Sequence, residues 1–251
     1  MSTLYYVYGV IQKEHVPKFK QSVHTDIIGA VYEEVPASEF SQTALETNLK
    51  DVGWVSEKVV WHQQLVAGTQ QLCAVVPLKF GSVFTSKWLV QKSLLGEQAH
   101  NFIDKLKRIE GKEEWGIKMM SDQEKFSLAV GHINPDLKAL NEGSKEASAG
   151  TSFLMKKKKE ALQKTIEKQE INLLRHRLYD KVKEISSEIV EAPLQENNQS
   201  NGLTNTLNLA VLTSKNDTQE LLSAIEEEQS HMSNFGVSID VTGPWPPYHF
   251  V

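Results

Sequence analysis

The sequence of 251 residues contains one cysteine, Cys73. It can form no internal disulfide, and none of the usual cysteine-based zinc patterns can be built from it. Cys73 lies in the apolar run 72–76 and has no basic neighbour of the kind that marks a reactive thiolate. We therefore interpret it as a small core residue, in a chain suited to a reducing cytoplasm.

Long apolar runs and a strong net charge are also missing. No window approaches 18 consecutive apolar residues, so the sequence predicts no membrane span. The opening MSTLYYVYGV has no basic n-region, and we expect no secretory signal. The net charge of −5 gives no strong field that would recruit nucleic acid or a membrane surface.

The sequence lacks the short motifs that are typical of nucleotide-binding, hydrolase and metal sites. The phosphate-binding loops GxxxxGK[ST] and GxGxxG, the GxSxG elbow and paired histidines of the HExxH or HxxxH type are all absent. A metal site would need ligands from distant segments. We therefore expect no catalytic residues, no nucleotide or other cofactor, and no metal.

A chemical role remains an alternative at two places, His62 and the turn at 79–82. His62 lies on an apolar helical face with Val55, Val59 and Val66, where it could act as an acid or base. We favour a hydrogen-bonded core histidine, because the sequence identifies no Ser, Cys or carboxylate partner for it. The glycine turn KFGS at 79–82 could hold an anion beside Lys79, although a tight turn is the commoner explanation.

Alternation of strand and helix patterns predicts an α+β protein of two domains. The aromatic and β-branched run 4–11 is typical of a strand. Further strand and helix patterns follow with short crossovers in both halves of the chain. We expect domains at 1–111 and 112–251, each with a mixed or antiparallel sheet and helices on one face.

A long basic helix is predicted over residues 152–191 in the second domain. Between 156 and 183, ten Lys or Arg face four acidic residues, so this segment carries +6 and the rest of the chain about −11. It opens with four consecutive lysines, 156–159. A solvated face is our preferred interpretation; the alternatives are an RNA or acidic-membrane contact and a docking face for an acidic protein. The aromatics that would stack on bases are missing from this face.

The last nine residues, GPWPPYHFV at 243–251, are rich in proline and aromatics. Residues that precede proline avoid the helical region, so the segment should be extended and should lose little conformational entropy when it becomes ordered. Three large aromatics, each able to bury about 150 to 250 Å², indicate a packing element. We expect this tail to fold back on the C-terminal domain; the alternative is that it docks on a partner.

Five segments in order resemble the gas vesicle protein F/L family: YYVYGVI, VVPLKFGSVF, EEWGIKM, GTSFLMKKKKE and TGPWPPYHFV. The resemblance runs from Leu4 to Val251 and is nearer to the F members than to the L members. It implies two α+β domains with ferredoxin-like elements and no catalytic activity.

The resemblance also implies a minor structural or accessory role in gas vesicle assembly. The expected partners are the hydrophobic major shell protein and other gas vesicle accessory proteins, at the vesicle shell in a prokaryotic cytoplasm, without nucleic acid or lipid membrane. The alternatives are an RNA- or membrane-surface-binding protein using the 156–183 helix, and an enzyme centred on His62 and the KFGS turn. The candidate partner-binding residues are Lys156, Lys157, Lys158, Lys159, Trp245, Tyr248 and Phe250.

Overall fold

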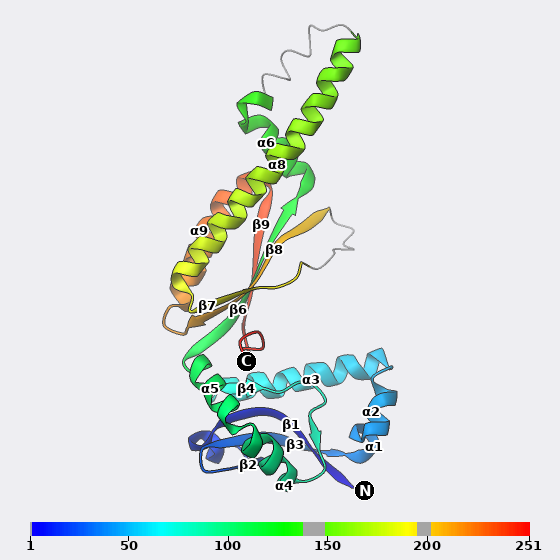
Figure 1. The fold of residues 1–251 in the computed structure, drawn as a ribbon, viewed down its shortest axis with the longest axis vertical. Coiled ribbons are helices and arrows are strands. Elements are labelled where there is room, and N and C mark those ends of the chain that lie inside the picture. Colours follow the sequence, from blue (N-terminus) through cyan, green and yellow to red (C-terminus); the bar gives the residue numbers. More distant parts are fainter. Residues whose placement is uncertain (1, 138–148, 195–201) are drawn as a thin grey trace. The chain divides into compact units, whose positions relative to one another are not determined.

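The computed structural model describes residues 2–137, 149–194 and 202–251 (Figure 1). They form two compact units. The first is Met1–Glu114 together with Pro244–Val251, and the second is Trp115–Gly243. The chain thus passes into the second unit within strand β6 (Lys112–Asp122), rather than between residues 111 and 112. Helices and strands occur in both units, which confirms the α+β class.

The first unit is built on an antiparallel sheet centred on β1 (Thr3–Gln12). On one side β1 pairs with β3 (Ile28–Pro36), which pairs in turn with β2 (Ser22–His24). On its other side β1 pairs with β4 (Val75–Pro77) and β5 (Val83–Phe84). The strand predicted at 4–11 is therefore the central strand of this unit.

Strand β1 contributes side chains to two cores, and a bulge shifts their alternation. The register with β3 shifts between Val7 and Gly9. Tyr6 and Tyr8 pack on one face and Val7 on the other, and after the bulge Ile11 returns to the tyrosine face. Glycine is required at position 9 by a close approach, because a Cβ there would lie 2.5 Å from Val75 Cγ2.

Helices cover both faces of this first sheet. The Tyr6 face packs against α1 (Ala37–Phe40), α2 (Gln42–Asn48) and α3 (Val52–Gln70). The Val7 face packs against the π-helix η2 (Val90–Glu97) and α5 (Ala99–Ile109). Two shorter elements complete the unit, η1 (Lys13–Lys18) and α4 (Lys87–Leu89). The expected arrangement of helices on a single face does not extend to this unit.

Local capping explains where two of these helices begin. The Asp51 side chain accepts hydrogen bonds from the backbone N–H groups of Gly53 and Trp54 at the start of α3. Ser86 Oγ likewise accepts from Leu89 N at 3.2 Å, and serine is among the residues that sequences favour at such a cap.

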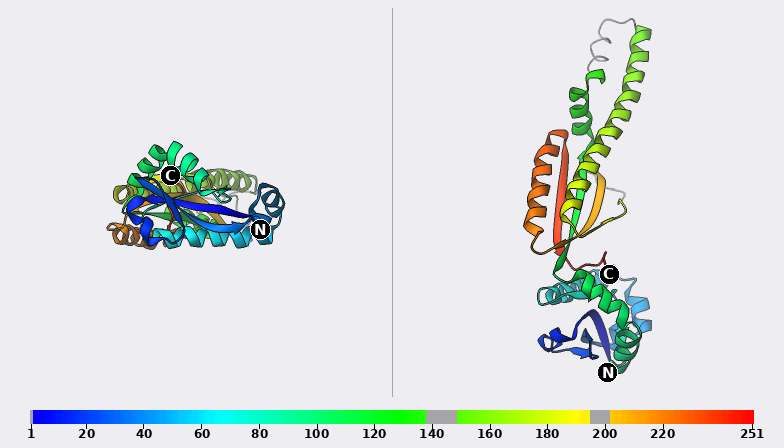
Figure 2. Two further views of the ribbon diagram at one scale, coloured as in Figure 1. Left: turned by 90° about the horizontal axis from the view of Figure 1, so that it is seen from below. Right: turned by 60° about the vertical axis from the view of Figure 1, so that its left-hand side comes forward.

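The second unit has the strand order β7-β8-β6-β9 in its sheet. The first and third strands in the chain, β6 and β8, lie at the centre of the sheet, and the second and fourth, β7 and β9, lie at its edges. This is the order of a ferredoxin-like βαββαβ unit. Helices α8 and α9 lie side by side (Figure 2) and pack on the sheet through one continuous core. The elements after β6 are α6 (Gln123–Ile133), α8 (Ala149–Ile185), β7 (Glu188–Glu191), β8 (Leu203–Ser214), α9 (Thr218–Met232), η3 (Ser233–Phe235) and β9 (Val237–Trp245).

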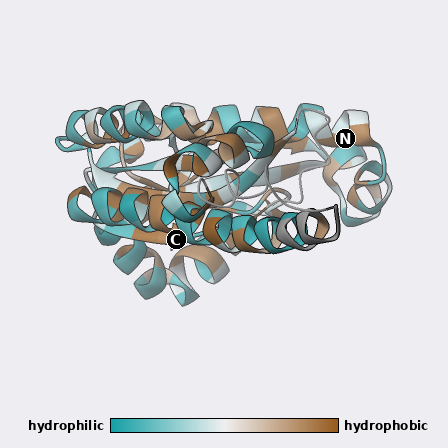
Figure 3. Ribbon diagram, turned by 90° about the horizontal axis from the view of Figure 1, so that it is seen from above, coloured by the Kyte–Doolittle hydropathy of each residue, from teal (hydrophilic) through white to brown (hydrophobic). Residues whose placement is uncertain are grey.

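The long helix carries an apolar stripe that packs in the core of this unit. Its buried positions on α8 are Ile166, Leu174, Leu178 and Val182, which recur at helical spacing and face the sheet. Helices in Figure 3 accordingly alternate between hydrophobic and hydrophilic residues along their length.

The long helix is shorter at its C-terminus than the predicted range 152–191. It ends at Ile185, and residues 188–191 form β7, which pairs antiparallel with β8. Ser186 Oγ donates to Val182 O, and Ser187 N donates to Leu212 O at 2.8 Å, so the chain leaves the helix and joins the sheet. The β-branched pair Ile189 and Val190 suits this extended strand better than a helix.

Candidate partner-binding site

The proline and aromatic tail is held firmly in place. Pro246, Pro247 and Phe250 are buried, and Phe250 is only 1% exposed. Two short-range hydrogen bonds shape the turn, from Tyr248 N to Pro246 O and from Phe250 N to Pro247 O. Trp245 and Tyr248 remain 42% and 37% exposed. The tail therefore has a buried anchor and an outward aromatic edge.

Polar side chains anchor the same segment. Gln70 Nε2 donates to Trp245 O at 3.0 Å, and Tyr248 Oη donates to Gln63 Oε1 at 3.0 Å. The buried Glu114 carboxylate accepts from His249 N at 3.0 Å and lies 2.6 Å from His249 Nδ1. Both carboxylate oxygens thus have partners, which offsets the cost of burying the group.

The electrostatics of this anchor favour a neutral Tyr248. Burial, and then the negative charge of Glu114, raise the pKa of Tyr248 to about 12. The phenol therefore stays protonated at neutral pH and remains a hydrogen-bond donor to Gln63.

These contacts correct the expected position of the tail. It completes the first unit rather than the C-terminal domain, because its anchors Gln63, Gln70 and Glu114 all belong to the first unit. The sequence pattern correctly indicated that the tail is ordered, but nothing local in it says which sheet it joins. Phe250 is an anchor and not an exposed contact residue.

One face of α3 carries two anchors of the tail and two exposed valines. Val52, Val59, Gln63 and Gln70 are spaced by seven, four and seven residues, so they lie on the same side of the helix. The tail covers the glutamines, while Val52 and Val59 remain 79% and 43% exposed. We call the exposed set Val52, Val59, Trp245 and Tyr248 the tail–α3 strip.

The lysine cluster lies near the N-terminal end of α8. Lys156, Lys157 and Lys158 are exposed, Lys159 is half-buried, and the Lys157 Nζ atom sits 5.2 Å from the centre of the Phe153 ring. These side chains do not lie in the tail–α3 strip, which belongs to the other unit.

Two arginines further along α8 are engaged within the unit. Arg175 pairs with Glu191 at 3.0 Å, and Arg177 Nε donates to the buried Glu228 at 2.6 Å. Their charge is therefore partly neutralised locally, and the exposed positive charge of α8 concentrates toward its lysines.

His62 lies in a buried aromatic cluster. Tyr6 Oη is 2.8 Å from His62 Nδ1 and accepts from Gly81 N at 3.3 Å, so the hydroxyl hydrogen is directed to the imidazole. Burial lowers the pKa of His62, and a hydrogen bond with the Leu78 backbone partly opposes this. Burial also raises the pKa of Tyr6 to about 12. These contacts fit the core histidine that we favoured from the sequence.

The KFGS segment has the geometry of a tight turn. Gly81 has φ of 85°, a left-handed conformation that favours glycine. Ser82 N and Ser82 Oγ both donate to Lys79 O, while the Gly81 N–H is already bonded to Tyr6. The turn therefore directs these donors inward to the protein rather than to an anion.

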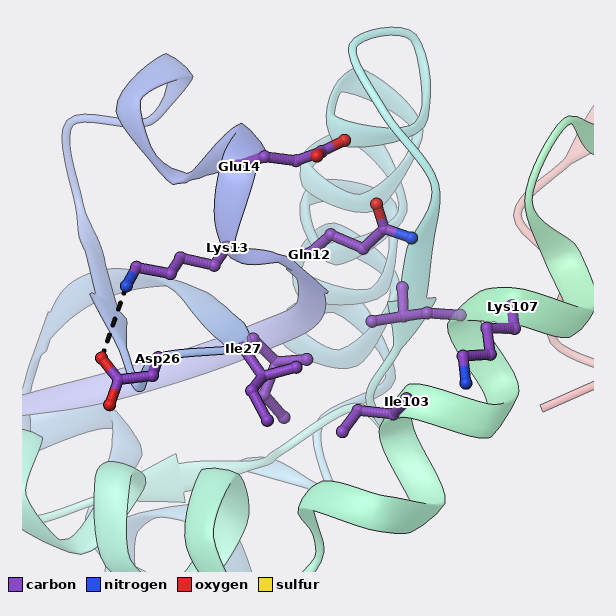
Figure 4. Close-up of a pocket in the computed structure, with 9 residues that line it drawn as sticks. Gln12, Lys13, Glu14, Asp26, Ile27, Ile103 and Lys107 are labelled. Atoms are coloured by element: carbon purple, nitrogen blue, oxygen red, sulfur yellow. Dashed lines mark hydrogen bonds and ion pairs between the residues drawn. The ribbon is translucent and has the colours of Figure 1, made fainter.

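A pocket of about 540 Å³ lies elsewhere in the first unit (Figure 4). Its apolar lining comes from Ile27, Ile28, Ile103 and Leu106, and its rim carries the Lys13–Asp26 ion pair at 3.4 Å. None of the residues singled out from the sequence lines it. Among the described residues, no three His, Cys, Asp or Glu side chains are grouped to hold a metal ion. Within residues 2–137, 149–194 and 202–251, none of the helices qualifies as a membrane span.

Solved structures share this fold along the whole chain. The crystal structure of GvpF from Anabaena sp. PCC7120 superposes with a TM-score of 0.68 and 20% identity, covering 100% of this chain and 98% of that one. GvpF from Microcystis aeruginosa gives a TM-score of 0.66 at 16% identity, with coverage of 100% and 99%. The protein thus has the two-part α+β fold seen in these GvpF structures.

The sequence comparisons assign the family. The family described as "Gas vesicle synthesis protein GvpL/GvpF" matches residues 4–251, so the chain belongs to the GvpL/GvpF family. Gas vesicle protein L1 of Halobacterium salinarum is 25% identical over 233 residues, 91% of this chain and 79% of that protein. Gas vesicle protein F of Streptomyces sp. is 24% identical over 255 residues and covers 100% of both chains. Membership in this family implies a role in gas vesicle formation.

Proposed function

We propose that this chain is a non-enzymatic accessory or minor structural protein of gas vesicles, which acts in vesicle assembly by contacting the hydrophobic major shell protein. The observation that carries the proposal is the family match over residues 4–251. Its relatives are named as gas vesicle proteins, which supports association with other gas vesicle proteins at the vesicle in the cytoplasm.

The tail–α3 strip is the contact surface we propose for the shell protein. Its two aromatic side chains remain exposed on the anchored tail, and its two valines are exposed on α3. Rigid aromatics lose little side-chain entropy on binding and are frequent anchors of protein interfaces. An apolar partner gains most from such a surface.

The test measures binding of the full-length protein to purified major shell protein. Changing Val52, Val59 and Trp245 together to serine should weaken binding by about tenfold or more, since apolar anchors dominate such interfaces. The matched control is Leu173→Ser on α8, because Leu173 is 61% exposed but lies in the other unit. Equal losses in both variants would contradict this contact surface.

Salt dependence separates this proposal from a nucleic-acid or membrane-surface role for helix 156–183. Apolar docking on the shell protein should change little between low and moderate salt. Binding to RNA or to acidic vesicles would weaken steeply over the same range, because it releases counterions. Strong RNA or lipid binding without any shell-protein binding would overturn the proposed function.

We assign a secondary role to Lys156, Lys157, Lys158 and Lys159. Their charge would assist approach to an acidic patch on a partner without contributing much to the fold.

A further inference from the structure

The edge strand β9 is closed by a side chain of its neighbouring helix. Gln229, on α9, accepts a hydrogen bond from Ile239 N through Oε1 and donates to Val237 O through Nε2 at 3.4 Å. One amide group thus satisfies both a donor and an acceptor of the β9 backbone, which is the pattern a neighbouring strand would offer.

These backbone groups face away from the rest of the sheet. The order β7-β8-β6-β9 puts β9 at one end, and Asp122 N, at the end of β6, donates to Gly236 O at 2.9 Å. Backbone groups alternate in direction along a strand, so those of 236, 238 and 240 point to β6. Those of Val237, Ile239 and Val241 then point outward, where Gln229 reaches two of the three residues.

We propose that the outer edge of β9 is a strand-pairing surface for a second copy of this chain, and that Gln229 holds it closed. The edge is an extended template for pairing, and native proteins protect such edges explicitly. Gln229 is well suited to that task because it occupies the hydrogen bonds that an incoming strand must form.

The sequence of β9 favours a second copy in one antiparallel register. With Ile239 opposite Ile239 of the other copy, Val237 lies opposite Val241, and these outward groups form the hydrogen-bonded pairs. Ser238 then lies opposite Asp240, so the strand's single charged residue meets a small polar side chain and not another carboxylate. The side chains of Val237, Ile239 and Val241 already pack on the core of the unit, and pairing would join two such cores.

The experiment compares Gln229→Asn and Gln229→Ala in the full-length protein by analytical ultracentrifugation over a range of concentrations. Asparagine keeps the amide but is one methylene shorter, so it should fail to reach the edge. Both variants should form dimers at concentrations where the wild-type protein is monomeric. The matched control is Gln219→Ala, because Gln219 lies on the same helix and bonds only to Ser223 among the contacts described.

A charge pair at position 238 tests the register. In the Gln229→Asn background, Ser238→Lys should tighten the dimer roughly tenfold, because two Lys–Asp240 pairs form across the symmetric edge. Ser238→Asp should weaken it by a similar factor. Amide exchange at Ile239 and Val241 should slow as the dimer forms.

Two outcomes would overturn the proposal. One is a Gln229→Asn protein that melts normally but stays monomeric at all concentrations. The other is a dimer that responds in the same way to either charge at position 238. If Gln229→Ala alone loses its fold, the asparagine variant and its exchange pattern still decide the question.

Discussion

The two units of this protein differ in where their most distinctive segments lie. The first unit is completed by an apolar tail and contains a buried Tyr6–His62 pair and the buried Glu114. The second unit carries its lysine-rich helix on the surface of a ferredoxin-like core. The difference teaches that the tail acts on the first unit through packing and internal hydrogen bonds, whereas the exposed Lys156, Lys157 and Lys158 of α8 are available to solvent and partners.

The largest expected effect is on the tail anchor. Phe250→Ala should destabilise the first unit by about 3 to 5 kcal/mol, because it leaves a cavity in a fully buried site. Thermal unfolding measures the loss, and hydrogen exchange should show it in α3 and not in α9. The control is Trp245→Ala, which removes a half-exposed ring and should cost less. A smaller loss for Phe250→Ala than for Trp245→Ala would refute the anchor.

A second expected effect concerns the hydroxyl of Tyr6. Tyr6→Phe leaves His62 Nδ1 and Gly81 N without this partner in a buried site, at a cost of about 1 to 3 kcal/mol. Chemical denaturation would measure it. Tyr5→Phe, on the other face of β1, serves as the control and should stay within about 0.5 kcal/mol of wild type. Equal effects would mean that the hydrogen bond contributes nothing specific.

A smaller effect is expected from pH. The pKa of His62 is lowered in the folded protein from its ordinary value of 6.5. The unfolded chain therefore takes up this proton first as the pH falls, and the contribution of His62 to stability is lost progressively below about pH 6.5. Unfolding curves between pH 8 and pH 5 should show this loss, and His62→Gln should reduce it. The expectation would be contradicted if the wild-type protein became more stable on acidification and the variant did not.

The smallest effect on stability is expected for the lysines. Changing Lys156, Lys157, Lys158 and Lys159 to glutamine should leave the free energy of unfolding within about 0.5 kcal/mol of wild type, because they are largely solvated. Binding to a shell protein should weaken slightly, and only at low salt. A large fall in melting temperature would show that these side chains are structural, which would remove the contrast between the units.

Much of the fold could be predicted from patterns that act over a few residues. The aromatic and β-branched run 4–11, the Ser86 cap and the apolar stripe of the long helix each reflect local preferences that the structure retains. The end of that helix was mispredicted because Ile189 continues the apolar spacing of the helix. Residues 188–191 form a strand instead because they pair with β8, which is distant in sequence.

The candidate site depends even more on long-range contacts. The aromatics of the tail indicated an ordered segment, yet the anchors Gln63, Gln70 and Glu114 lie more than 130 residues away in the chain. The signal available in the sequence was the recurrence of Gln63 and Gln70 on the same helical face as Val52 and Val59. It could identify a face with an unusual mixture of residues, but not what covers it.

The position of the tail has a consequence for how the protein is made. In chain order the second unit is an insertion into the first, since residues 244–251 return to a body whose other residues end at Glu114. A ribosome releases the sheet of the first unit early, but Phe250 leaves the exit tunnel only after all of the second unit. The site that Phe250 fills in the first unit therefore stays empty until the whole of the second unit has been synthesised.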